Sequence, residues 1–384
     1  MITTADDIAA RAGTDLPMPR SASWREGLEL FLRDLDRSQT LLPGARENIE
    51  NYATATLNAR FGIEDWLARH PEAAESPVTR PLFILGMPRA GTTLLLNMLR
   101  FDPQRRVLWH WEGNRELPPA QTAHLLDDPR IAAKVREVNA MLDSGALPRN
   151  HHVELGDEPT ECIWPLAQDF KGYPWLVQTL VPDYFEWLMH DSDMGAAYAY
   201  QRRYLQVLQS SAPGSWTLKL PSHARAVEDI IANFPDARIL MTHRDPIKPV
   251  ASSCSLCDQI LSLQNHTVDR KMLGYQTAKL NALGAHRMSV ARDAHPEVPF
   301  MDIHYKPFTA DPMATVRKLY AFEGLELLPE VEAKMQAALD QHNAARDAAG
   351  AHRYSLEEYG LDVAGLDRMF GDYVSRYGIE MERT

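Results

Sequence analysis

The chain has 384 residues, a formal net charge of −12 and only three cysteines. Its length exceeds one typical domain but also suits a single α/β domain with insertions, so one or two domains are allowed. The acidic balance argues against nucleic acid as a partner, because that binding depends on many Lys and Arg contacts to phosphate. An anion site in this chain must therefore be a local cluster of positive charge.

The N-terminal residues do not resemble a secretory signal. Residues 1–13 include Asp6, Asp7 and Arg11 and contain no apolar core run. No stretch approaches the about 20 apolar residues that span a bilayer. Three cysteines are too few, and an odd number, for a disulfide framework. We therefore expect a cytoplasmic monomer or homodimer without a transmembrane segment.

Apolar residues recur at helical spacing in the first part of the chain. The pattern predicts a helix over residues 24–35, a second over 49–61 and a short third over 63–67. The polar, proline-bounded segment 71–77 is interpreted as a linker. We expect residues 1–77 to form a helical cap that packs on the core.

The most informative stretch is PLFILGMPRAGTTLLLNMLR, residues 81–100. Its apolar run 82–85 is bounded by proline and glycine and is too short for a helix, which predicts a buried strand. Residues 93–99 are nearly all strong helix formers. The stretch therefore predicts a strand, a tight loop over residues 86–93 and a helix. After this helix, residues 106–110 are interpreted as a second strand.

The loop has the features of a phosphate cradle. Gly91 lets the backbone approach an anion closely, and the N–H groups that open the helix point toward it. A nucleotide-triphosphate loop also needs Lys directly after this glycine, and here Thr92 stands there, which disfavours ATP or GTP chemistry. The positive charge lies at Arg89, whose planar fork suits two anionic oxygens. An ordinary strand-turn-helix of a nucleotide fold is the alternative.

The segment PRAGTT resembles the PKSGTT or PRSGTT loop of sulfotransferases that use PAPS, 3′-phosphoadenosine 5′-phosphosulfate. The resemblance implies that the loop holds the 5′-phosphosulfate. The implied cofactor contacts are Arg89, Ala90, Gly91, Thr92, Thr93 and Leu94. Ala90 replaces the usual Ser, which removes one hydroxyl contact.

A second group of polar residues follows a predicted strand, WTLKL, over residues 216–220. This strand delivers Lys219 and His223 to its carboxyl end, which is where open α/β sheets bind ligands. An amphipathic helix is predicted over 224–234. Histidine is the side chain best suited to take a proton near neutral pH.

Residues 238–242 predict another buried strand, which ends in His-Arg-Asp-Pro. Arg244, followed eight residues later by Ser252, resembles the second sulfotransferase signature, and the resemblance implies that both hold the 3′-phosphate of PAPS. A salt bridge of Arg244 to Asp245 is the alternative. In the next helix, Cys254 and Cys257 lie on an apolar stripe and are interpreted as core residues rather than a redox pair.

Residues 147–162 are rich in turns, histidine and acids. A metal site can be built from His151, His152 and Glu154, but adjacent histidines do not share a helix face, and we expect no metal. The segment resembles an acidic stretch of bacterial sulfotransferases. The resemblance implies acceptor-side contacts from Glu158, Glu161 and His152, with a solvated acidic loop as the alternative. Aromatic residues over 170–204 suggest either an acceptor pocket or core packing.

The last part of the chain completes the α/β pattern, with a strand predicted over 298–305 and helices over 311–322 and 329–343. Strands that alternate with helices predict a mostly parallel sheet, and the resemblance implies a P-loop-like three-layer fold. We expect residues 78–384 to form this domain, with an acceptor-side insertion around 110–210. Arg353 resembles the family's late basic motif, which implies a cofactor contact.

The resemblance spans roughly residues 80–380 and implies a PAPS-dependent sulfotransferase without a metal. Its acceptor would be a hydroxyl of a small molecule, lipid or carbohydrate. The implied catalytic residues are His223 as general base, with Arg89 and Lys219 beside the sulfuryl group. Rival bases are Glu158, Glu161, His151 and His152, and a buried core histidine is the other interpretation of His223. The alternatives are a P-loop nucleotide kinase or phosphotransferase, and a catalytically silent nucleotide-binding protein on the same fold.

Overall fold

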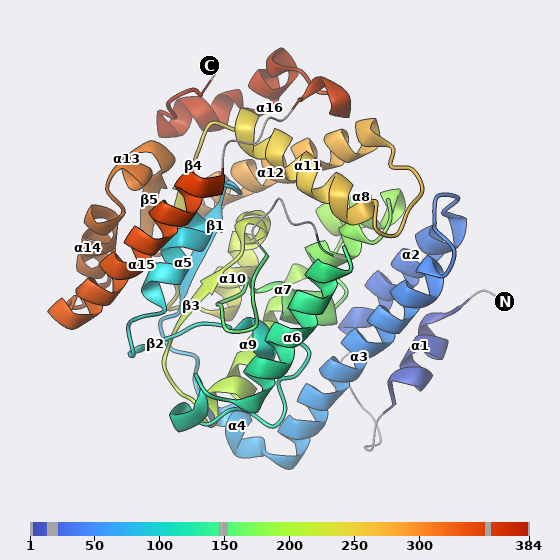
Figure 1. Ribbon diagram of the computed structural model, residues 1–384, viewed down its shortest axis with the longest axis horizontal. Coiled ribbons are helices and arrows are strands. Elements are labelled where there is room, and N and C mark those ends of the chain that lie inside the picture. The colour runs from blue at the N-terminus through green and yellow to red at the C-terminus, as the bar shows by residue number, and fades with distance from the viewer. Residues whose placement is uncertain (1–2, 14–21, 146, 148–152, 350–354, 383–384) are drawn as a thin grey trace. The chain divides into compact units, whose positions relative to one another are not determined.

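The computed structural model describes residues 3–13, 22–145, 147, 153–349 and 355–382, and Figure 1 shows their helices and strands. The chain divides into two compact units. The first comprises residues 1–78, 108–213 and 256–269, and the second comprises residues 79–107, 214–255 and 270–384. The predicted cap and the predicted insertion around 110–210 thus contribute to the same unit.

The second unit contains a five-stranded parallel sheet in the order β2-β3-β1-β4-β5. Its strands are β1 (Leu82–Gly86), β2 (Arg105–Arg106), β3 (Ser215–Lys219), β4 (Arg238–His243) and β5 (Phe300–His304). The predicted α/β fold with a parallel sheet is confirmed. From β1 the chain crosses to the edge strand β2 and returns to β3 beside β1, and from β3 it crosses past β1 to β4. The connections thus change direction around β1, and such a point is where these sheets bind ligands.

Helices cover both faces of this sheet, as the strand alternation requires. Leu82 and Ile84 pack into a core formed with α5 (Thr92–Leu99), α14 (Pro312–Glu323) and α15 (Pro329–Ala349). Phe83, between them in sequence, faces the other way and contacts Phe234 at a ring distance of 5.2 Å. The remaining helices of the unit are α10 (Val227–Asn233), the first part of α11 (Ile247–Leu261), α12 (Arg270–Ala294), α13 (Tyr305–Ala310) and α16 (Val363–Tyr377).

Two predictions in this unit were wrong in extent. The strand expected over residues 106–110 ends at Arg106, because from Leu108 the chain belongs to the first unit, where the Leu108 carbonyl accepts from the Thr160 N–H at 2.8 Å. The helix expected over 224–234 begins as a 3₁₀ turn, η4 (Pro221–Ala226), and is α-helical only from Val227.

The first unit is built of helices. They are α1 (Ala5–Ala12), α2 (Ser23–Arg37), α3 (Ala45–Arg69), α4 (Pro71–Glu75), α6 (Pro129–Asp143), α7 (Ile163–Gln168), α8 (Pro182–His190) and α9 (Met194–Gln209). The two helices predicted over 49–61 and 63–67 are one, since Gly62 does not break α3 and instead lets Leu117 approach its backbone. The predicted linker 71–77 begins with α4, which Pro71 can open.

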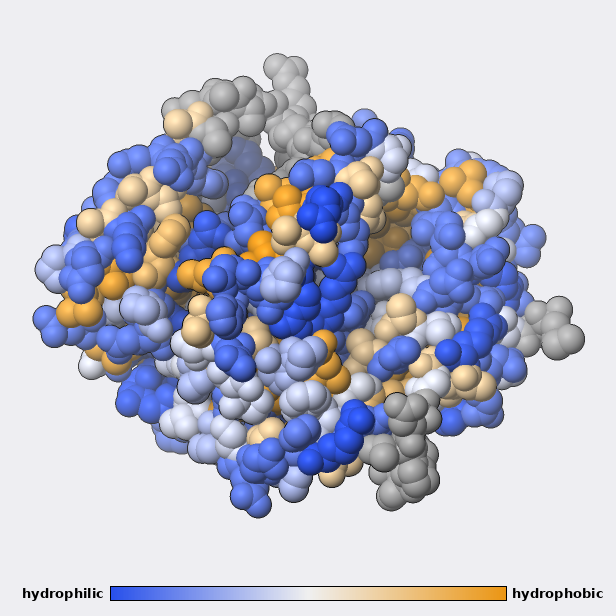
Figure 2. Space-filling view, turned by 60° about the horizontal axis from the view of Figure 1, so that its bottom comes forward, coloured by the Kyte–Doolittle hydropathy of each residue, from blue (hydrophilic) through white to orange (hydrophobic). Residues whose placement is uncertain are grey.

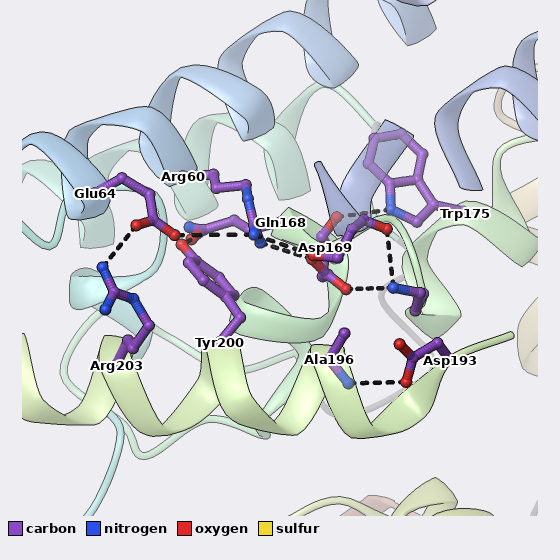
Figure 3. A network of polar contacts seen from close by, with 12 residues as sticks. Arg60, Glu64, Gln168, Asp169, Trp175, Asp193, Ala196, Tyr200 and Arg203 are labelled. Atoms are coloured by element: carbon purple, nitrogen blue, oxygen red, sulfur yellow. Dashed lines mark hydrogen bonds and ion pairs between the residues drawn. The ribbon is translucent and has the colours of Figure 1, made fainter. Parts of the chain in front are cut away.

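A buried polar network crosses this unit (Figure 3). Asp169 is fully buried and accepts from Lys171 Nζ at 2.6 Å, while Arg60 Nη1 lies 2.7 Å from its other oxygen. The Arg60 guanidinium lies 3.9 Å from the ring centre of Tyr200, whose hydroxyl donates to Gln168 at 2.6 Å. A buried charge is tolerated only with such partners, so this cluster is a structural part of the first unit.

On the face shown in Figure 2, hydrophilic residues dominate and hydrophobic residues occur in small groups. Within the described parts of the chain, no helix combines the length and the apolar character needed to cross a membrane.

Candidate active site

The loop of residues 86–93 leaves the carboxyl end of β1, at the strand where the sheet order reverses. Gly86 has a φ of 121°, and a Cβ there would lie 2.4 Å from the Thr242 carbonyl oxygen of β4. The Thr242 hydroxyl donates to the Leu85 carbonyl at 3.0 Å, and the Met87 N–H donates to the Thr242 carbonyl at 3.0 Å. Glycine is required here because the two backbones touch.

Gly91 opens α5 in the left-handed region, with a φ of 87°. A Cβ at this position would lie 2.6 Å from the Phe308 ring, so a larger residue would be excluded by space as well as by conformation. Glycine has no side chain with which to cap the helix. The first backbone N–H groups of α5 therefore suit an anion, and the binding of one by this loop stays a prediction.

Arg89 also adopts a left-handed conformation, with a φ of 58°, although it is not glycine. Such a backbone costs about 1–3 kcal/mol and is held by its surroundings. The Arg89 carbonyl accepts a hydrogen bond from Nη1 of Arg244, which follows β4. The Arg89 side chain is exposed. The strained backbone therefore joins the two predicted motifs.

Lys219 ends β3, directly beside Ile84 of β1 in the register of the sheet. Its side chain is buried, and Nζ donates to the Thr93 hydroxyl at 3.3 Å. Thr93 is the second residue of α5. A buried ammonium at the start of a helix adds to the local positive potential, so Lys219, Thr93 and the loop form one anion-attracting cluster.

His223 lies in η4, four residues after Lys219, and its ring is fully buried edge-on to Phe83 at 5.3 Å. Burial, with a smaller effect of Arg225, lowers the pKa of His223 to about 3. The imidazole is therefore neutral at physiological pH and able to accept a proton. Its low pKa is a poor match for proton transfer near pH 7, because the best general bases titrate near the working pH.

Arg244 lies beside a cavity of about 230 Å³ in the second unit. Its Nε and Nη2 donate to the two oxygens of Glu382 at 2.6 and 2.8 Å, and its guanidinium stacks on Tyr305 at 3.6 Å. The alternative partner raised by the sequence, Asp245, instead accepts from the backbone N–H groups of Ile247 and Glu382. The partner of Arg244 comes from the C-terminal end of the chain.

His243, the residue before Arg244, was not singled out from the sequence. Its buried ring bridges Asp302 at 3.0 Å and the Tyr373 hydroxyl at 3.3 Å. Burial raises the pKa of Asp302, but hydrogen bonds from His243 and Arg292 outweigh this effect and bring the pKa down to about 2. The Tyr373 hydroxyl also receives the Arg244 N–H at 3.4 Å. These contacts hold the backbone of the Arg244 motif, and the only sign of them in the sequence is that His243 directly precedes Arg244.

The other predicted site residues fall in three places. Ser252 is buried on α11, in the second unit, while Cys254 and Cys257 are buried on the same helix, as predicted for core residues. Glu158 and Glu161 are half-buried in the first unit. Arg353, His151 and His152 lie outside the described residues.

Two acidic side chains of the segment 147–162 accept hydrogen bonds from within the segment. Glu158 accepts from the Leu155 N–H at 2.8 Å, and Glu154 accepts from the Thr160 hydroxyl at 2.6 Å. The described residues contain no group of three His, Cys, Asp or Glu side chains placed to hold a metal ion.

The aromatic cluster over 170–204 is mainly core. Trp175 stacks on Phe170 at 4.5 Å and meets Phe31 of α2 edge-on at 5.0 Å, and all three are fully buried. Tyr173 is the member that is only half-buried, and its hydroxyl contacts the Cys257 sulfur at 2.7 Å.

The chain matches the sulfotransferase family model over residues 81–330, which is more than half of its length. It belongs to the sulfotransferase family. The crystal structure of sulfotransferase STF9 from Mycobacterium avium is 37% identical, covers 99% of this chain and 98% of its own, and superposes with a TM-score of 0.89. Sulfotransferase STF1 from Mycobacterium tuberculosis H37Rv is 26% identical with a TM-score of 0.84, covering 96% and 98% of the two chains.

A curated relative, omega-hydroxy-beta-dihydromenaquinone-9 sulfotransferase Stf3 of Mycobacterium bovis, is 23% identical over 84% of this chain and 82% of its own. The predictions of an enzyme, of the sulfotransferase family and of its P-loop-like fold are confirmed. This sulfotransferase transfers a sulfuryl group, and the family implies PAPS as the donor. Kinase chemistry, the rival prediction, is not favoured.

Proposed function

We propose that the loop of residues 86–93, Lys219 and Arg244 bind PAPS, and that the enzyme passes its sulfuryl group to a hydroxyl oxygen. One observation carries the proposal. The loop, Lys219 and Arg244 leave the carboxyl ends of the adjacent strands β1, β3 and β4, in one compact unit. An anionic ligand with a phosphosulfate at one end and a phosphate at the other matches cations spread along such an edge.

Each residue has a separate role in this proposal. The N–H groups opening α5, with Lys219, face the phosphosulfate. Arg89 stabilises the bridging oxygen as it leaves, because its fork of donors suits an oxygen that gains charge. Arg244 and Ser252 bind the 3′-phosphate. Ala90, Thr92 and Leu94 shape the loop around the donor, and Arg353 remains a predicted contact.

The transfer exchanges one S–O bond for another. The acceptor oxygen forms a new bond to sulfur, the bond from sulfur to the bridging oxygen breaks, and 3′-phosphoadenosine 5′-phosphate (PAP) departs. The acceptor hydroxyl gives its proton to a base. His223 remains our proposed base because its ring is neutral, and Glu158, Glu161, His151 and His152 are the rivals. The low pKa of His223 places its expected contribution at the lower end of the range for general bases.

For the acceptor we propose a lipid-like alcohol as the first class to test. The support is the curated relative whose name specifies a hydroxylated menaquinone. Small-molecule and carbohydrate alcohols are the alternatives, and the acidic segment with Glu158 and Glu161 is our proposed acceptor side. Incubating purified protein with labelled PAPS and a cell extract, followed by mass spectrometry, identifies the sulfated product. Absence of any labelled product would contradict catalysis by this chain.

A titration separates the proposed donor from a nucleoside triphosphate. We expect calorimetry to show PAP binding at least about tenfold tighter than ATP, since Thr92 stands where a triphosphate loop needs Lys. Equal or tighter binding of ATP would contradict the donor assignment.

A further inference from the structure

Two carboxylates from residues 380–382 lie against the cations of the Arg244 subsite. Glu382 holds Arg244 through both oxygens, and Lys248 Nζ lies 3.7 Å from the same carboxylate. Lys306, which lines the same cavity, is paired with Glu380. A cluster of three cations is thus neutralised in part by the C-terminal segment.

The contact at Arg244 has the geometry expected of a bound phosphate. Glu382 takes the edge of the guanidinium formed by Nε and Nη2, in the two-point arrangement that carboxylates and phosphates share. Nη1 donates to the Arg89 carbonyl, and Tyr305 covers one face. The edge of Arg244 best suited to an incoming phosphate is therefore already used by a carboxylate.

The segment that brings Glu382 makes charged contacts to the site. The α16 helix ends at Gly378, with a φ of 57°, and Ile379 is the buried residue that follows, its N–H donating to the Val374 carbonyl at 3.0 Å. After Ile379, the chain contacts the site through the two carboxylates and through the Glu382 N–H, which donates to Asp245. Such contacts can be exchanged for others of the same sign without unpacking the core.

We propose that Glu382 is an intramolecular counter-anion of the nucleotide site, which must release Arg244 before the 3′-phosphate binds. The inference rests on the proposed role of Arg244. A phosphate carries about −1.5 to −2 charges at neutral pH, so it would be repelled by carboxylates left beside it. Burial raises the pKa of Glu382, but contact with Arg244 and the nearby lysines outweighs this effect and lowers it. The carboxylate therefore stays charged and competes with the phosphate for Arg244. Glu380, which is more exposed, is a second and weaker counter-anion, paired with Lys306.

This assignment predicts the sign of a mutational effect. If Glu382 competes with phosphate, then removing its charge tightens nucleotide binding. If Glu382 instead supports Arg244 in its binding geometry, then removing the charge weakens binding. The two possibilities cannot give the same result.

The experiment is a calorimetric titration of the full chain with PAP and with 5′-AMP, which lacks the 3′-phosphate. Glu382→Gln should bind PAP about three- to tenfold more tightly than the wild type, since a partly buried ion pair no longer has to be broken, and should bind 5′-AMP unchanged. Glu380→Gln should show the same sign with a smaller effect. Glu332→Gln is the matched control, because it removes the same charge from a pair with Arg317 in the same unit.

Unchanged or weaker PAP binding by Glu382→Gln would overturn the inference, as would equal tightening by Glu332→Gln. An Arg244→Ala titration in the same series separates this failure from that of the proposed function. If Arg244→Ala loses PAP selectively while Glu382→Gln does not tighten it, only the counter-anion is wrong. If Arg244→Ala loses PAP and 5′-AMP equally, both assignments fall.

Discussion

The first unit has an ion cluster around Asp169, and the second has one around Arg244. Asp169 is fully buried, and its partners Arg60 and Lys171 are buried with it. Arg244 is partly exposed beside a cavity, and its carboxylate partner comes from a segment after the last helix. Breaking the first cluster leaves unpaired charges in the core. Breaking the second leaves charges that water or a ligand can reach.

The surroundings of an arginine's carboxylate partner indicate whether the arginine serves the stability of the fold or ligand binding. A carboxylate fixed by the core serves the fold, and the Glu382 carboxylate, which lines a cavity, is the one that we expect to exchange with a ligand. We therefore expect substitutions at the first cluster to change stability and substitutions at the second to change nucleotide binding.

The largest expected effect is at Asp169. Asp169→Ala should lower the free energy of unfolding by about 3–5 kcal/mol, because Arg60 and Lys171 lose their buried partner. Urea unfolding measures this loss. The control is Asp193→Ala, which removes an exposed carboxylate that caps α9 and should cost about 1 kcal/mol. Equal losses in the two variants would show that the buried cluster contributes little.

The next effect concerns turnover. Arg89→Ala should lower kcat by about 10²–10³-fold, with a smaller change in PAP affinity, because the lost contact forms chiefly as the bridging oxygen gains charge. Arg89→Lys keeps the charge and the same backbone position and should retain more activity. If PAP binding collapses while kcat at saturation survives, Arg89 only anchors the nucleotide.

The stability of the protein should depend on pH through Glu116, a buried residue of the first unit. Burial raises the pKa of Glu116 to about 7 in the folded state, above its unfolded value near 4.5. The folded protein binds the proton more tightly than the unfolded chain does. The contribution of Glu116 to the free energy of unfolding is therefore fully present below pH 4.5 and falls as pH rises toward 7, by about 3 kcal/mol in total. Glu116→Gln should flatten this part of the stability profile relative to the wild type. Parallel profiles for the two proteins would contradict the raised pKa.

The proposed base has a smaller expected effect. His223→Gln should lower kcat about 10²-fold with PAP affinity retained. Because the pKa of His223 is about 3, the wild-type rate profile should show no inflection near pH 6.5 from this residue. Glu158→Gln and Glu161→Gln are assayed in parallel. Near-normal turnover of the histidine variant, with a large loss in either glutamate variant, would move the role to the acidic segment.

Much of the fold followed from local pattern. The short apolar runs predicted four strands, and the glycines of the loop marked backbone positions that only glycine can take. The continuity of α3 was missed because Gly62 looks like a helix break unless Leu117 is known to pack on it. The strand predicted over residues 106–110 was too long, because the extent of β2 depends on where the chain passes into the first unit.

The place of the candidate site residues was predictable where they follow predicted strands, and their roles stay predictions. Arg89, Lys219 and Arg244 stand at strand ends and could be found from the strands themselves. The partners His243–Asp302 and Arg244–Glu382 are 59 and 138 residues apart, and no spacing rule connects them. Burial of His223 was raised from the sequence only as an alternative, because it depends on Phe83 from another strand.

The central claim is that Arg244 recognises the 3′-phosphate, and a paired titration tests it most directly. PAP and 5′-AMP differ only in that phosphate, and removing a charge-assisted contact loses about 1.5–3 kcal/mol, or roughly ten- to a hundredfold in affinity. Arg244→Ala should therefore weaken PAP by this factor and leave 5′-AMP nearly unchanged in calorimetry. Equal losses for both nucleotides would contradict the account.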